Sequence, residues 1–578
     1  MKELNEKVKF IVDRIAIEGV SPETIAELIT VPQDTEMGDY CLPTFKLAKL
    51  LRKSPVVIAS DVAASFKPEG VVSKVEAVNG YVNFFLNKTS FAKEVIEKAL
   101  SEGKNYGSSD VGKDKTVCID YSSINIAKPF HMGHLSTTVI GGALYRIHKK
   151  LGYKTVGINH LGDWGTQFGK LIVAFKKWGS EKTLQKKGVS YLNQLYVKFH
   201  EEAEKDPTLE FEARLWFKKI EDGNEEAVRL WTLFKEITLE SVKDVYKRLK
   251  ISFDSYNGEA FYNDKMGVVM DELRDKGLLK ESDGAQIVDL SDYNMPPCLV
   301  AKQDGATLYA TRDLAAAFYR KKRYDFHKCL YVVAYQQDLH FRQVFKVLEL
   351  LGKDWAKDMV HVKFGMVSME GGEAMSTRKG KVILLEDVIN KAVERSLKVI
   401  REKNPDLKNA ADIAEQVGVG AVIFSSLYNG RIKDIVFSYD KILNFDGETG
   451  PYVQYTNARC NSVLKKGHDY WKRYASGEYV PTDEDYAKGV ANKEAVEVVR
   501  LIEKYPEVLK DVLVDYEPSI LTRYIMNLAQ AYNKFYFEHK IITAEDGARE
   551  TRLMLTMAVH RVLEDGLKLL GISCPKKM

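Results

Sequence analysis

Two histidines separated by a methionine and a glycine, His131-Met132-Gly133-His134, follow an apolar run and open a stretch with helical spacing. Such a position suits phosphate groups, because the free N–H groups and the dipole of a helix N-terminus stabilise negative charge. Two imidazoles there can donate hydrogen bonds to phosphate oxygens while charge builds up during displacement at phosphorus. Gly133 leaves room for a base to pack closely. The pattern indicates nucleotidyl transfer, although histidines that only cap or pack in a loop would look the same.

A second segment, residues 374–381 (AMSTRKGK), lies between a predicted strand and an apolar run with helical character. Its three cations, Arg378, Lys379 and Lys381, could close over a triphosphate and stabilise departing pyrophosphate. Taken alone, the segment would be a solvated basic turn, as most such runs are. Because the two histidines precede it in the same predicted sheet domain, we expect it to act on the same nucleotide.

The elements around the histidines predict how they are positioned. Residues 116–121 (TVCIDY) indicate a strand, residues 135–150 have a helical pattern, and residues 155–159 (TVGIN) indicate a second strand. The histidines lie in the polar loop between the first strand and the helix. Strand, loop, helix and strand form a βαβ unit, and parallel sheets of this kind bind ligands at the carboxyl ends of their strands. The loop is therefore at the edge where a ligand is expected.

The whole chain is expected to be an α/β protein with a Rossmann-like parallel-sheet catalytic domain, an N-terminal α+β domain and a C-terminal all-helical domain. Turn formers near residue 105 and the loss of strand patterns after about residue 387 suggest the boundaries. We predict an N-terminal domain over 1–110, a catalytic domain over 111–390 with a helical insertion at about 175–250, and a helical domain over 391–578. Shorter predicted elements are an amphipathic helix in the first twenty residues, a helix at 45–51, and strands at 78–86, 330–334 and 361–367.

The composition is that of a folded protein with several domains. The 578 residues are 45% hydrophobic and 29% charged, and the net charge of +4 is small for this length, so any RNA contact should be localised. The longest uncharged stretch, 417–430, is broken by Gly, Ser and Asn and predicts a buried helix, so we expect no membrane span. Scattered cysteines without a CxxC pair predict reduced thiols, no structural zinc and a cytoplasmic location; they are Cys41, Cys118, Cys298, Cys329, Cys460 and Cys574.

These motifs resemble a known family. A histidine motif such as HMGH and a KMSKS-like loop such as residues 374–381 are the paired motifs of class I aminoacyl-tRNA synthetases. Residues 125–130 (NIAKPF) and 159–169 (NHLGDWGTQFG) resemble the arginyl-tRNA synthetases in particular. Ala374 stands where the KMSKS pattern has its first Lys. The resemblance implies that Lys128 supplies the missing charge, which a flexible ammonium can do from another loop.

The resemblance also implies an amino-acid pocket. Arginine is a planar cation with five donors, so a selective pocket needs carboxylates that pair with it in bidentate fashion, and a lysine ammonium would not satisfy them. Tyr309 and Asp313 match the family residues that hold the guanidinium, and a helix that includes Tyr309 would place both on one face. Glu259 matches a residue that contacts the rest of the substrate. Without the family, Asp313 could equally be an exposed acid in a first helical turn, and Glu259 a surface turn residue.

The complete set of site residues that the resemblance implies falls into three groups. Catalytic residues are Lys128, His131, His134, Arg378, Lys379 and Lys381. ATP is bound by His131, Gly133, His134, Met375 and Ser376. Arginine is bound by Asn125, His160, Glu259, Tyr309, Asp313 and Gln337.

RNA contacts are implied at both ends of the chain. Tyr452, Tyr455 and Arg459 match family positions at the anticodon, where aromatic rings and Arg suit unpaired bases. Their spacing of three and four is also that of a core stripe, which the sequence alone favours. Met578 matches a C-terminus near the anticodon. Asn83 and Phe85 match a contact with the outer corner of tRNA, for which a buried strand is an equal alternative.

The function implied is arginine–tRNA ligation. Arginine would attack the α-phosphate of ATP, with Mg²⁺ on the phosphates and no protein ligand assigned to it. The 2′-hydroxyl of the terminal adenosine of tRNA(Arg) would then attack the adenylate. The partners expected are tRNA(Arg), L-arginine and ATP, and we expect a monomer. Rivals are another HxGH nucleotidyltransferase, the cysteinyl synthetase, and an inactive RNA-binding paralogue.

Overall fold

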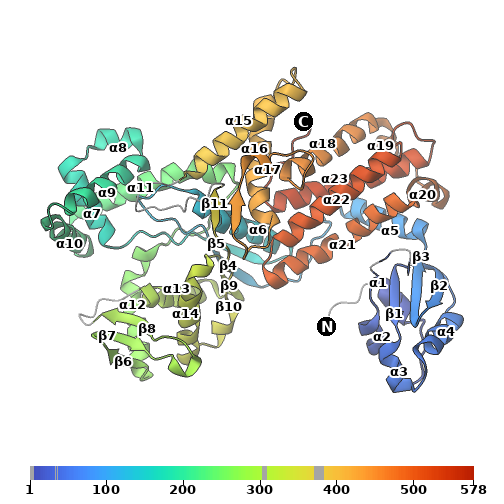
Figure 1. Cartoon of the computed structure of the whole chain (residues 1–578), viewed down its shortest axis with the longest axis horizontal. Helices are drawn as coiled ribbons and strands as arrows, with labels where there is room; N and C mark the ends of the chain where they lie inside the picture. Colours follow the sequence, from blue (N-terminus) through green and yellow to red (C-terminus); the bar gives the residue numbers. More distant parts are fainter. Residues whose placement is uncertain (1–5, 33, 35–36, 303–308, 370–382) are drawn as a thin grey trace. The chain divides into compact units, whose positions relative to one another are not determined.

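The computed structural model of the chain describes residues 6–32, 34, 37–302, 309–369 and 383–578 (Figure 1). Its contacts define two compact units. The smaller unit comprises Met1–Tyr106, Cys460–Glu503 and Gln530–Arg561, and the larger comprises Gly107–Arg459, Lys504–Ala529 and Val562–Met578. The larger unit contains the loop with the two histidines.

Four parallel strands form the central sheet of the larger unit, in the spatial order β10-β9-β4-β5 (Figure 1). They are β4 (Thr116–Asp120), β5 (Lys154–Ile158), β9 (Lys328–Tyr331) and β10 (Met359–His361). The chain passes from β4 to β5 on one side and later adds β9 on the other side of β4. The loops that leave β4 and β9 therefore diverge, and ligands are expected at the carboxyl ends of these strands, as in other sheets with this arrangement.

Helices cover both faces of this sheet. Helix α6 (Leu135–Lys150) connects β4 to β5, and α14 (Asp338–Leu350) connects β9 to β10. Crossover connections of this kind are right-handed, so connections that run in opposite directions across the sheet place α6 and α14 on opposite faces. Successive side chains of β4 point to opposite faces of the sheet. Cys118 joins the buried cluster on the α14 side, and Val117 and Ile119 are buried on the other side.

The predicted elements of this sheet are largely confirmed. The helix at 135–150 has the predicted ends, and the strands at 116–121, 155–159 and 330–334 are present with ends displaced by a few residues. The strand predicted at 361–367 is wrong. Strand β10 ends at His361, and Gly365 packs against the backbone at Lys433, where the chain leaves the central sheet.

The helical stretch predicted at about 175–250 is present, and its helices pack on one another (Figure 1). Its amphipathic periodicity explains this, since each helix buries one apolar stripe. The helices are α7 (Thr166–Trp178), α8 (Glu181–Lys187), α9 (Val189–Ala203), α10 (Thr208–Glu221) and α11 (Glu225–Arg248).

The segment between this stretch and β9 adds a small antiparallel sheet and two helices. The sheet order is β6-β7-β8. Its residues and those of the flanking helices form one buried cluster with the central sheet. The elements are η4 (Glu259–Lys265), α12 (Met266–Asp275), β6 (Leu279–Ser282), β7 (Ala285–Val288), η5 (Ser291–Tyr293), β8 (Cys298–Lys302) and α13 (Tyr309–Tyr324), followed after β9 by η6 (Tyr335–Gln337) and after α14 by η7 (Asp354–Asp358).

The C-terminal part is helical, as predicted, apart from one short parallel pair of strands. Strand β11 (Val367–Met369) pairs with β12 (Ile435–Phe437). Among the described residues, only α16 (Ala410–Tyr428) is long and apolar enough to cross a membrane, and 72% of its apolar window is buried inside the chain. This confirms the buried helix predicted over 417–430. The remaining helices are α15 (Leu385–Lys403), α17 (Tyr439–Ile442), α18 (Gly450–Lys466), α19 (His468–Ala475), α20 (Asp483–Val490), α21 (Lys493–Asp515), α22 (Ser519–Glu538) and α23 (Ala548–Leu569).

The N-terminal part of the smaller unit has a three-stranded antiparallel sheet in the order β1-β3-β2. The helix predicted at 45–51 is confirmed as α3. The elements are α1 (Glu6–Val12), α2 (Pro22–Leu28), β1 (Tyr40–Pro43), α3 (Phe45–Leu51), α4 (Pro55–Ser65), β2 (Val72–Val78), β3 (Tyr81–Leu86), α5 (Lys88–Glu102) and η2 (Gly103–Asn105).

Two N-terminal predictions need correction. The amphipathic helix expected across the first twenty residues ends at Val12, and Gly19 has a φ of +81°. The single strand expected at 78–86 is a hairpin, because Asn79 and Gly80 have φ values of 51° and 84° and form the turn between β2 and β3. An Asn-Gly pair is the usual sequence of such a tight turn.

All six cysteines are free, and five of them are buried. Cys118 and Cys329 are direct partners on the neighbouring strands β4 and β9. Burial raises the pKa of the Cys118 thiol far above its usual range and raises the pKa of Cys329 to about 11. Both are therefore protonated, unreactive core side chains at ordinary pH.

Candidate active site

The loop after β4 has an unusual backbone. Ser122, Ser123 and Ala127 have φ values of 70°, 40° and 62°, a region that residues with a side chain rarely adopt. Such conformations persist only where neighbouring structure holds them, and they concentrate at functional sites. Here Thr238 of α11 holds the loop, since its buried hydroxyl accepts a hydrogen bond from the Ala127 N–H at 3.0 Å.

The two histidines at the end of this loop have fixed hydrogen-bonding roles. Nδ1 of His131 accepts from the Gly133 N–H at 3.1 Å, and Nδ1 of His134 accepts from the His131 N–H at 3.2 Å. A neutral imidazole whose Nδ1 accepts carries its hydrogen on Nε2. Each ring therefore keeps one free donor. The two histidines thus do cap the loop, as the alternative to a functional role proposed. This capping leaves the Nε2 donor of each ring available, so it is compatible with a functional role.

Both rings are uncharged at neutral pH. Burial and the charge of Lys128 lower the pKa of His131 to about 4. Burial, His131 and Lys128 together lower the pKa of His134 to about 3, although the backbone hydrogen bond raises it. The ring centroids are 4.0 Å apart. The half-buried Lys128 is thus close enough to both rings for its charge to act on them, and two neutral donors and one cation share this corner of the site.

Gly133 also has a structural reason beside the predicted one. A Cβ atom at this position would lie 2.8 Å from Cε1 of His131. The space that the glycine leaves is therefore occupied by the His131 ring, and close packing of a base is not needed to explain the glycine.

The segment that follows the second motif pairs with the loop of the two histidines. The Met132 N–H donates to the Ile383 carbonyl at 3.0 Å, the Leu385 N–H donates to the Phe130 carbonyl at 3.1 Å, and His131 and Leu384 form an antiparallel bridge. The chain thus resumes beside the HMGH loop directly after residue 382. The residues predicted to act here lie outside the described residues, and they are Ala374, Met375, Ser376, Arg378, Lys379 and Lys381.

The loop after β5 pairs with the loop after β4. Asn125 forms a parallel bridge with Gly162, and a Cβ atom at 162 would lie 2.2 Å from Oδ1 of Asn125. The next residue, Asp163, is completely buried, and its carboxylate accepts from Lys235 at 2.6 Å and from the Ala260 N–H at 2.9 Å. Asp163 therefore ties this loop to α11 and to the start of η4, next to Glu259.

Two carboxylates predicted to bind arginine come together here. Asp313 accepts from Nε2 of His340 at 2.6 Å, and Glu259 has a side chain 20% exposed, 3.9 Å from Arg312. Burial raises the pKa of Glu259 to about 7, with Arg312 opposing and Asp313 contributing to the increase. Burial would raise the pKa of Asp313, but His340 and nearby cations lower it overall. Asp313 is thus ionised at neutral pH and lies close enough to Glu259 to influence its pKa, and two such carboxyl groups suit a cation.

Three other predicted arginine-site residues lie in loops or at the start of a helix of the larger unit. Tyr309 is the first residue of α13, one turn before Asp313, and is 69% exposed. Gln337 is exposed in η6, after β9, and Asn125 is exposed in the loop after β4. Asn125 and Gln337 thus lie in the diverging loops that leave β4 and β9, where sheets of this kind bind ligands, whereas Tyr309 comes from the helix that carries Asp313.

His160 lies over a buried ion pair that the sequence did not predict. Nη2 of Arg320 is 2.7 Å from Oδ2 of Asp120 and 3.3 Å from Nδ1 of His160. Burial lowers the pKa of His160. The sequence held two signals for this group: Asp120 is a charge at the end of an apolar strand, and Arg320 follows Asp313 by two helical turns. His340, the third residue of α14, was also missed.

The residues predicted at the anticodon lie on α18. Tyr455 is 43% exposed, and the Arg459 guanidinium lies over its ring at 5.1 Å, while Tyr452 is half-buried. The core stripe that the sequence alone favoured is therefore wrong for Tyr455. Between them, Gln454 is fully buried and donates to the Ser573 carbonyl at 2.8 Å. Met578 packs on a small buried cluster of α15 and α16.

Asn83 and Phe85 are neighbours on one face of β3, the central strand of the N-terminal sheet. Asn83 is buried, as the alternative of a buried strand requires, and Phe85 is half-buried. Phe85 lines a cavity of about 670 Å³ in the smaller unit. Cations from β2, α5 and α21 also line it, namely Lys74, Lys88, Lys493 and Arg500.

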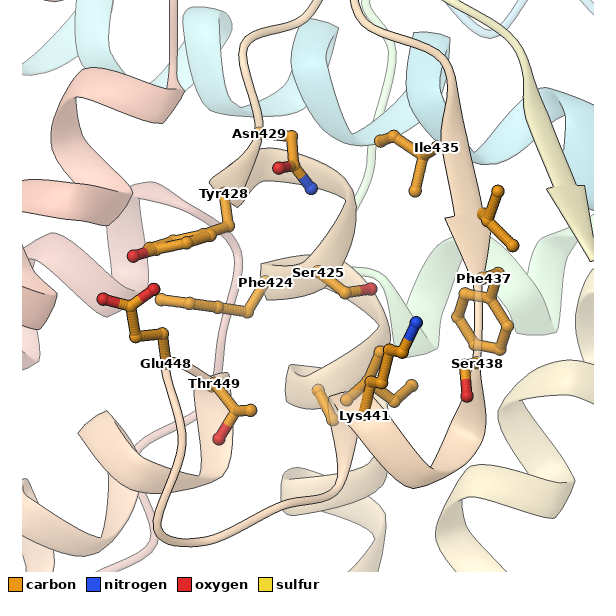
Figure 2. A pocket seen from close by; sticks show the side chains of 14 residues that line it. Phe424, Ser425, Tyr428, Asn429, Ile435, Phe437, Ser438, Lys441, Glu448 and Thr449 are labelled. Atoms are coloured by element: carbon orange, nitrogen blue, oxygen red, sulfur yellow. The ribbon is translucent and has the colours of Figure 1, made fainter. Parts of the chain in front are cut away.

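A further cavity, of about 160 Å³, lies between α16, β12 and α17 (Figure 2), and neither His131 nor His134 lines it. Its walls include Phe424 and Phe437, and the Ser425 hydroxyl and the Lys441 amine point into it (Figure 2). A hydrogen bond from Tyr428 to Glu448 lies at its rim, and burial with this contact raises the pKa of Tyr428 to about 12. None of the predicted site residues lines this cavity.

The fold and the site define a class. A parallel sheet with HMGH after its first strand, a helical insertion and a C-terminal helical part is the architecture of a class I aminoacyl-tRNA synthetase. In agreement, residues 95–439 match the family model "tRNA synthetases class I (R), catalytic domain". Residues 453–578 match "DALR anticodon binding domain", and residues 2–86 match "Arginyl tRNA synthetase N terminal domain".

Similar proteins narrow the class to one family. The chain is 54% identical to an arginine–tRNA ligase of Clostridioides difficile and 52% identical to one of Alkaliphilus metalliredigens, over 97% of the chain and of each relative. Its fold is similar to that of the Thermus thermophilus arginyl-tRNA synthetase, with a TM-score of 0.77, 24% identity and coverage of 95% of this chain and 96% of the other. The Plasmodium falciparum arginyl-tRNA synthetase also has a TM-score of 0.77, with 22% identity and 99% coverage of both chains. The chain belongs to the arginyl-tRNA synthetase family.

Proposed function

We propose that the chain is an enzyme that joins L-arginine to tRNA(Arg) by way of an arginyl-adenylate made from ATP. The observation that carries this proposal is identity above 50% to arginine–tRNA ligases across nearly the whole chain. The geometry supports it, because His131 and His134 keep donors for phosphate after β4, and Asp313, which lies close enough to Glu259 to raise its pKa, forms with it a pair of carboxyl groups that suits a cationic amino acid.

In the first step, the arginine carboxylate attacks the α-phosphorus of ATP, and pyrophosphate leaves. His131 and His134 donate from Nε2 to phosphate oxygens as charge moves onto them, and Lys128 adds the cation that the second motif lacks at Ala374. Arg378, Lys379 and Lys381, with Met375 and Ser376, complete the triphosphate site. Because both imidazoles are neutral, they stabilise charge by hydrogen bonding and do not serve as proton sources.

Arginine is held with its guanidinium between Tyr309 and Asp313. Glu259, Asn125, Gln337 and His160 contact the rest of the molecule. A planar cation can use both oxygens of a carboxylate, whereas an ammonium offers no matching pair of parallel donors. Selectivity for arginine over lysine follows from this difference.

In the second step, the 2′-hydroxyl of the terminal adenosine attacks the adenylate carbonyl and AMP leaves. Tyr452, Tyr455, Arg459 and Met578 contact the anticodon, and Asn83 and Phe85 contact the outer corner of the tRNA. The exposed Tyr455, with the guanidinium of the half-buried Arg459 over its ring, supports the first assignment, since a ring and a guanidinium together suit stacking on an unpaired base.

Mg²⁺ enters with ATP. The described residues contain no group of three or more His, Cys, Asp or Glu side chains that could hold a metal ion, and phosphate oxygens and water are ligands that Mg²⁺ accepts readily. The enzyme acts as a cytoplasmic monomer, and domain boundaries near residues 110 and 390 remain predictions.

The test is twofold. Exchange of labelled pyrophosphate into ATP should depend on arginine and, as the family resemblance implies, on tRNA. Purified tRNA should be charged with arginine and with no other amino acid. Exchange supported by a small acid other than an amino acid would favour another nucleotidyltransferase, and binding of tRNA without exchange or charging would favour an inactive paralogue.

A further inference from the structure

A buried guanidinium lies beneath the predicted arginine pocket. Arg320 is 1% exposed, and its Nη2 contacts both Asp120 and His160. A guanidinium only donates hydrogen bonds, so one hydrogen of Nη2 goes to the carboxylate and the other to Nδ1 of His160. With Nδ1 as acceptor, the uncharged His160 ring has its hydrogen on Nε2.

The His160 ring has a second restraint and several charged neighbours. It stacks on the buried Tyr262 of η4, with centroids 5.5 Å apart and planes at 21°. The charged groups that face it are Asp120 of β4, Arg320 and Asp313 of α13, and Asp163 of the loop after β5. Three carboxylates thus favour an imidazolium at this position, and burial and Arg320 oppose it.

We infer that Arg320 is a positioning residue that keeps His160 an uncharged hydrogen-bond donor, so that the cation paired with Asp313 is the substrate's guanidinium. This inference rests on the proposed function, in which Asp313 binds arginine. Without the guanidinium of Arg320, a protonated His160 would sit next to Asp313 and compete with the substrate for its charge.

The same geometry limits what His160 can contact. A guanidinium has no acceptor, and the only hydrogen-bonding atom that His160 has left is the Nε2 donor. His160 therefore serves an acceptor of the substrate, which is the carboxylate of arginine, and not its guanidinium. Within the arginine site, His160 is therefore assigned to the carboxylate of the substrate arginine, which is the group that reacts.

Arginine-dependent pyrophosphate exchange with tRNA present tests the inference in wild type, Arg320→Met, His160→Gln and the double variant, at pH 6 and pH 8. Relative to wild type, Arg320→Met should change the KM for arginine less than about threefold at pH 8 and raise it about tenfold at pH 6, since an imidazole freed from Arg320 titrates in this range. In the His160→Gln background, Arg320→Met should change the KM for arginine by the same factor at pH 6 and at pH 8. An increase in KM that is equal at both pH values, or that persists without His160, would overturn the inference.

Two further arms separate this role from a structural one. Removing Arg320 leaves the buried charge of Asp120 without its cation, so Arg320→Met is also combined with Asp120→Asn. The control is Arg323→Met, which removes an exposed arginine from the same helix, α13. Nitrogen-15 spectra of histidine-labelled wild type, assigned with His160→Gln, should show His160 protonated on Nε2 only at both pH values. An imidazolium in wild type at pH 6 contradicts the inference even if arginine proves not to be the substrate. Absence of arginine-dependent exchange in wild type would instead reject the proposed function.

Discussion

At the scale of single residues, the site works with hydrogen-bond donors whose direction is set by the backbone. Nδ1 of both motif histidines is occupied by a main-chain N–H, and low pKa values of about 4 and about 3 keep the rings neutral. A group whose charge changes near neutral pH must therefore be sought among the carboxyl groups, and Glu259 is one. The protonation state of Glu259 therefore affects how strongly the proposed arginine site attracts a cation.

The raised pKa of Glu259, about 7, gives a pH dependence with a definite sign. Below this value the free enzyme holds a proton that arginine binding must release, so affinity should increase as the pH rises. We expect the KM for arginine to fall about tenfold between pH 6 and pH 8, as for one proton per site. In Glu259→Gln the KM should be higher and nearly flat. A flat profile in wild type would contradict this assignment.

Asp313 should be the residue on which arginine recognition depends most. Asp313→Asn keeps the size of the side chain but removes its charge, and loss of a partly buried charge pair with the ligand costs about 2–5 kcal/mol, or about 30-fold or more in kcat/KM. Exchange kinetics measure this, and the KM for ATP should stay unchanged. Asp325→Asn, at an exposed turn just after α13, is the matched control. Unchanged activation in Asp313→Asn would refute the pocket.

At the scale of elements, the insertion helix α11 supports the catalytic loop. The Thr238 hydroxyl donates to the Phe234 carbonyl at 2.7 Å within α11 and accepts from Ala127, whose backbone is in a left-handed conformation. At the C-terminal end of α11, Arg248 forms a two-pronged pair with Glu415 of α16 and a hydrogen bond to Asn390 of α15. Helix α15 begins at the bridge to His131. These contacts make α11 a brace between the loop and the helices after the second motif.

Thr238→Val tests this brace. Valine has nearly the same shape but cannot accept the Ala127 N–H, and a buried unpaired N–H costs about 1–3 kcal/mol. We expect a lower unfolding temperature and a lower kcat for exchange, with little change in the KM for arginine. Thr238→Ser keeps the acceptor and should behave like wild type. Equal behaviour of the two variants would show that the hydroxyl contributes nothing.

On α18, Tyr455→Ala should raise the KM for tRNA while the KM for ATP stays the same. Stacking of one base on an aromatic ring contributes about 1–3 kcal/mol, so an increase of about fivefold or more is expected in charging assays. Tyr455→Phe keeps the ring and should charge normally. A tRNA affinity unaltered by the alanine substitution would leave Tyr455 as an ordinary exposed side chain.

At the scale of the larger unit, a single side chain joins distant parts of the sequence. Arg146 of α6 donates to the Leu569 carbonyl at the end of α23 and to the Lys250 carbonyl just after α11. A cation at two helix C-termini is favourable, because carbonyl groups there lack partners within the helix. The helix that starts at the HMGH motif is thus linked to the insertion and to the segment that leads to Met578.

The success of prediction differed with the range of the interactions. The loop, helix and strands around His131 follow from local patterns, and the structure has them within a few residues. The pairing of Met132 with Ile383 and of Arg320 with Asp120 and His160 joins residues far apart in sequence, and no local pattern specifies such contacts. The hairpin at Asn79-Gly80 had a local signal that was overlooked. Asp313 was expected from family resemblance, whereas its partner His340 was not, because a histidine has many roles.

The paired thiols of Cys118 and Cys329 have a consequence for experiment. They lie side by side in the middle of the central sheet, fully buried and protonated, so an alkylating reagent reaches them only when the sheet opens. Their labelling rate, followed by mass spectrometry, should therefore report opening of the catalytic sheet, and substrates that bind at its edge should slow it. Labelling as fast as in denaturant would contradict this. The two native thiols therefore allow the rate of sheet opening to be measured without an introduced label.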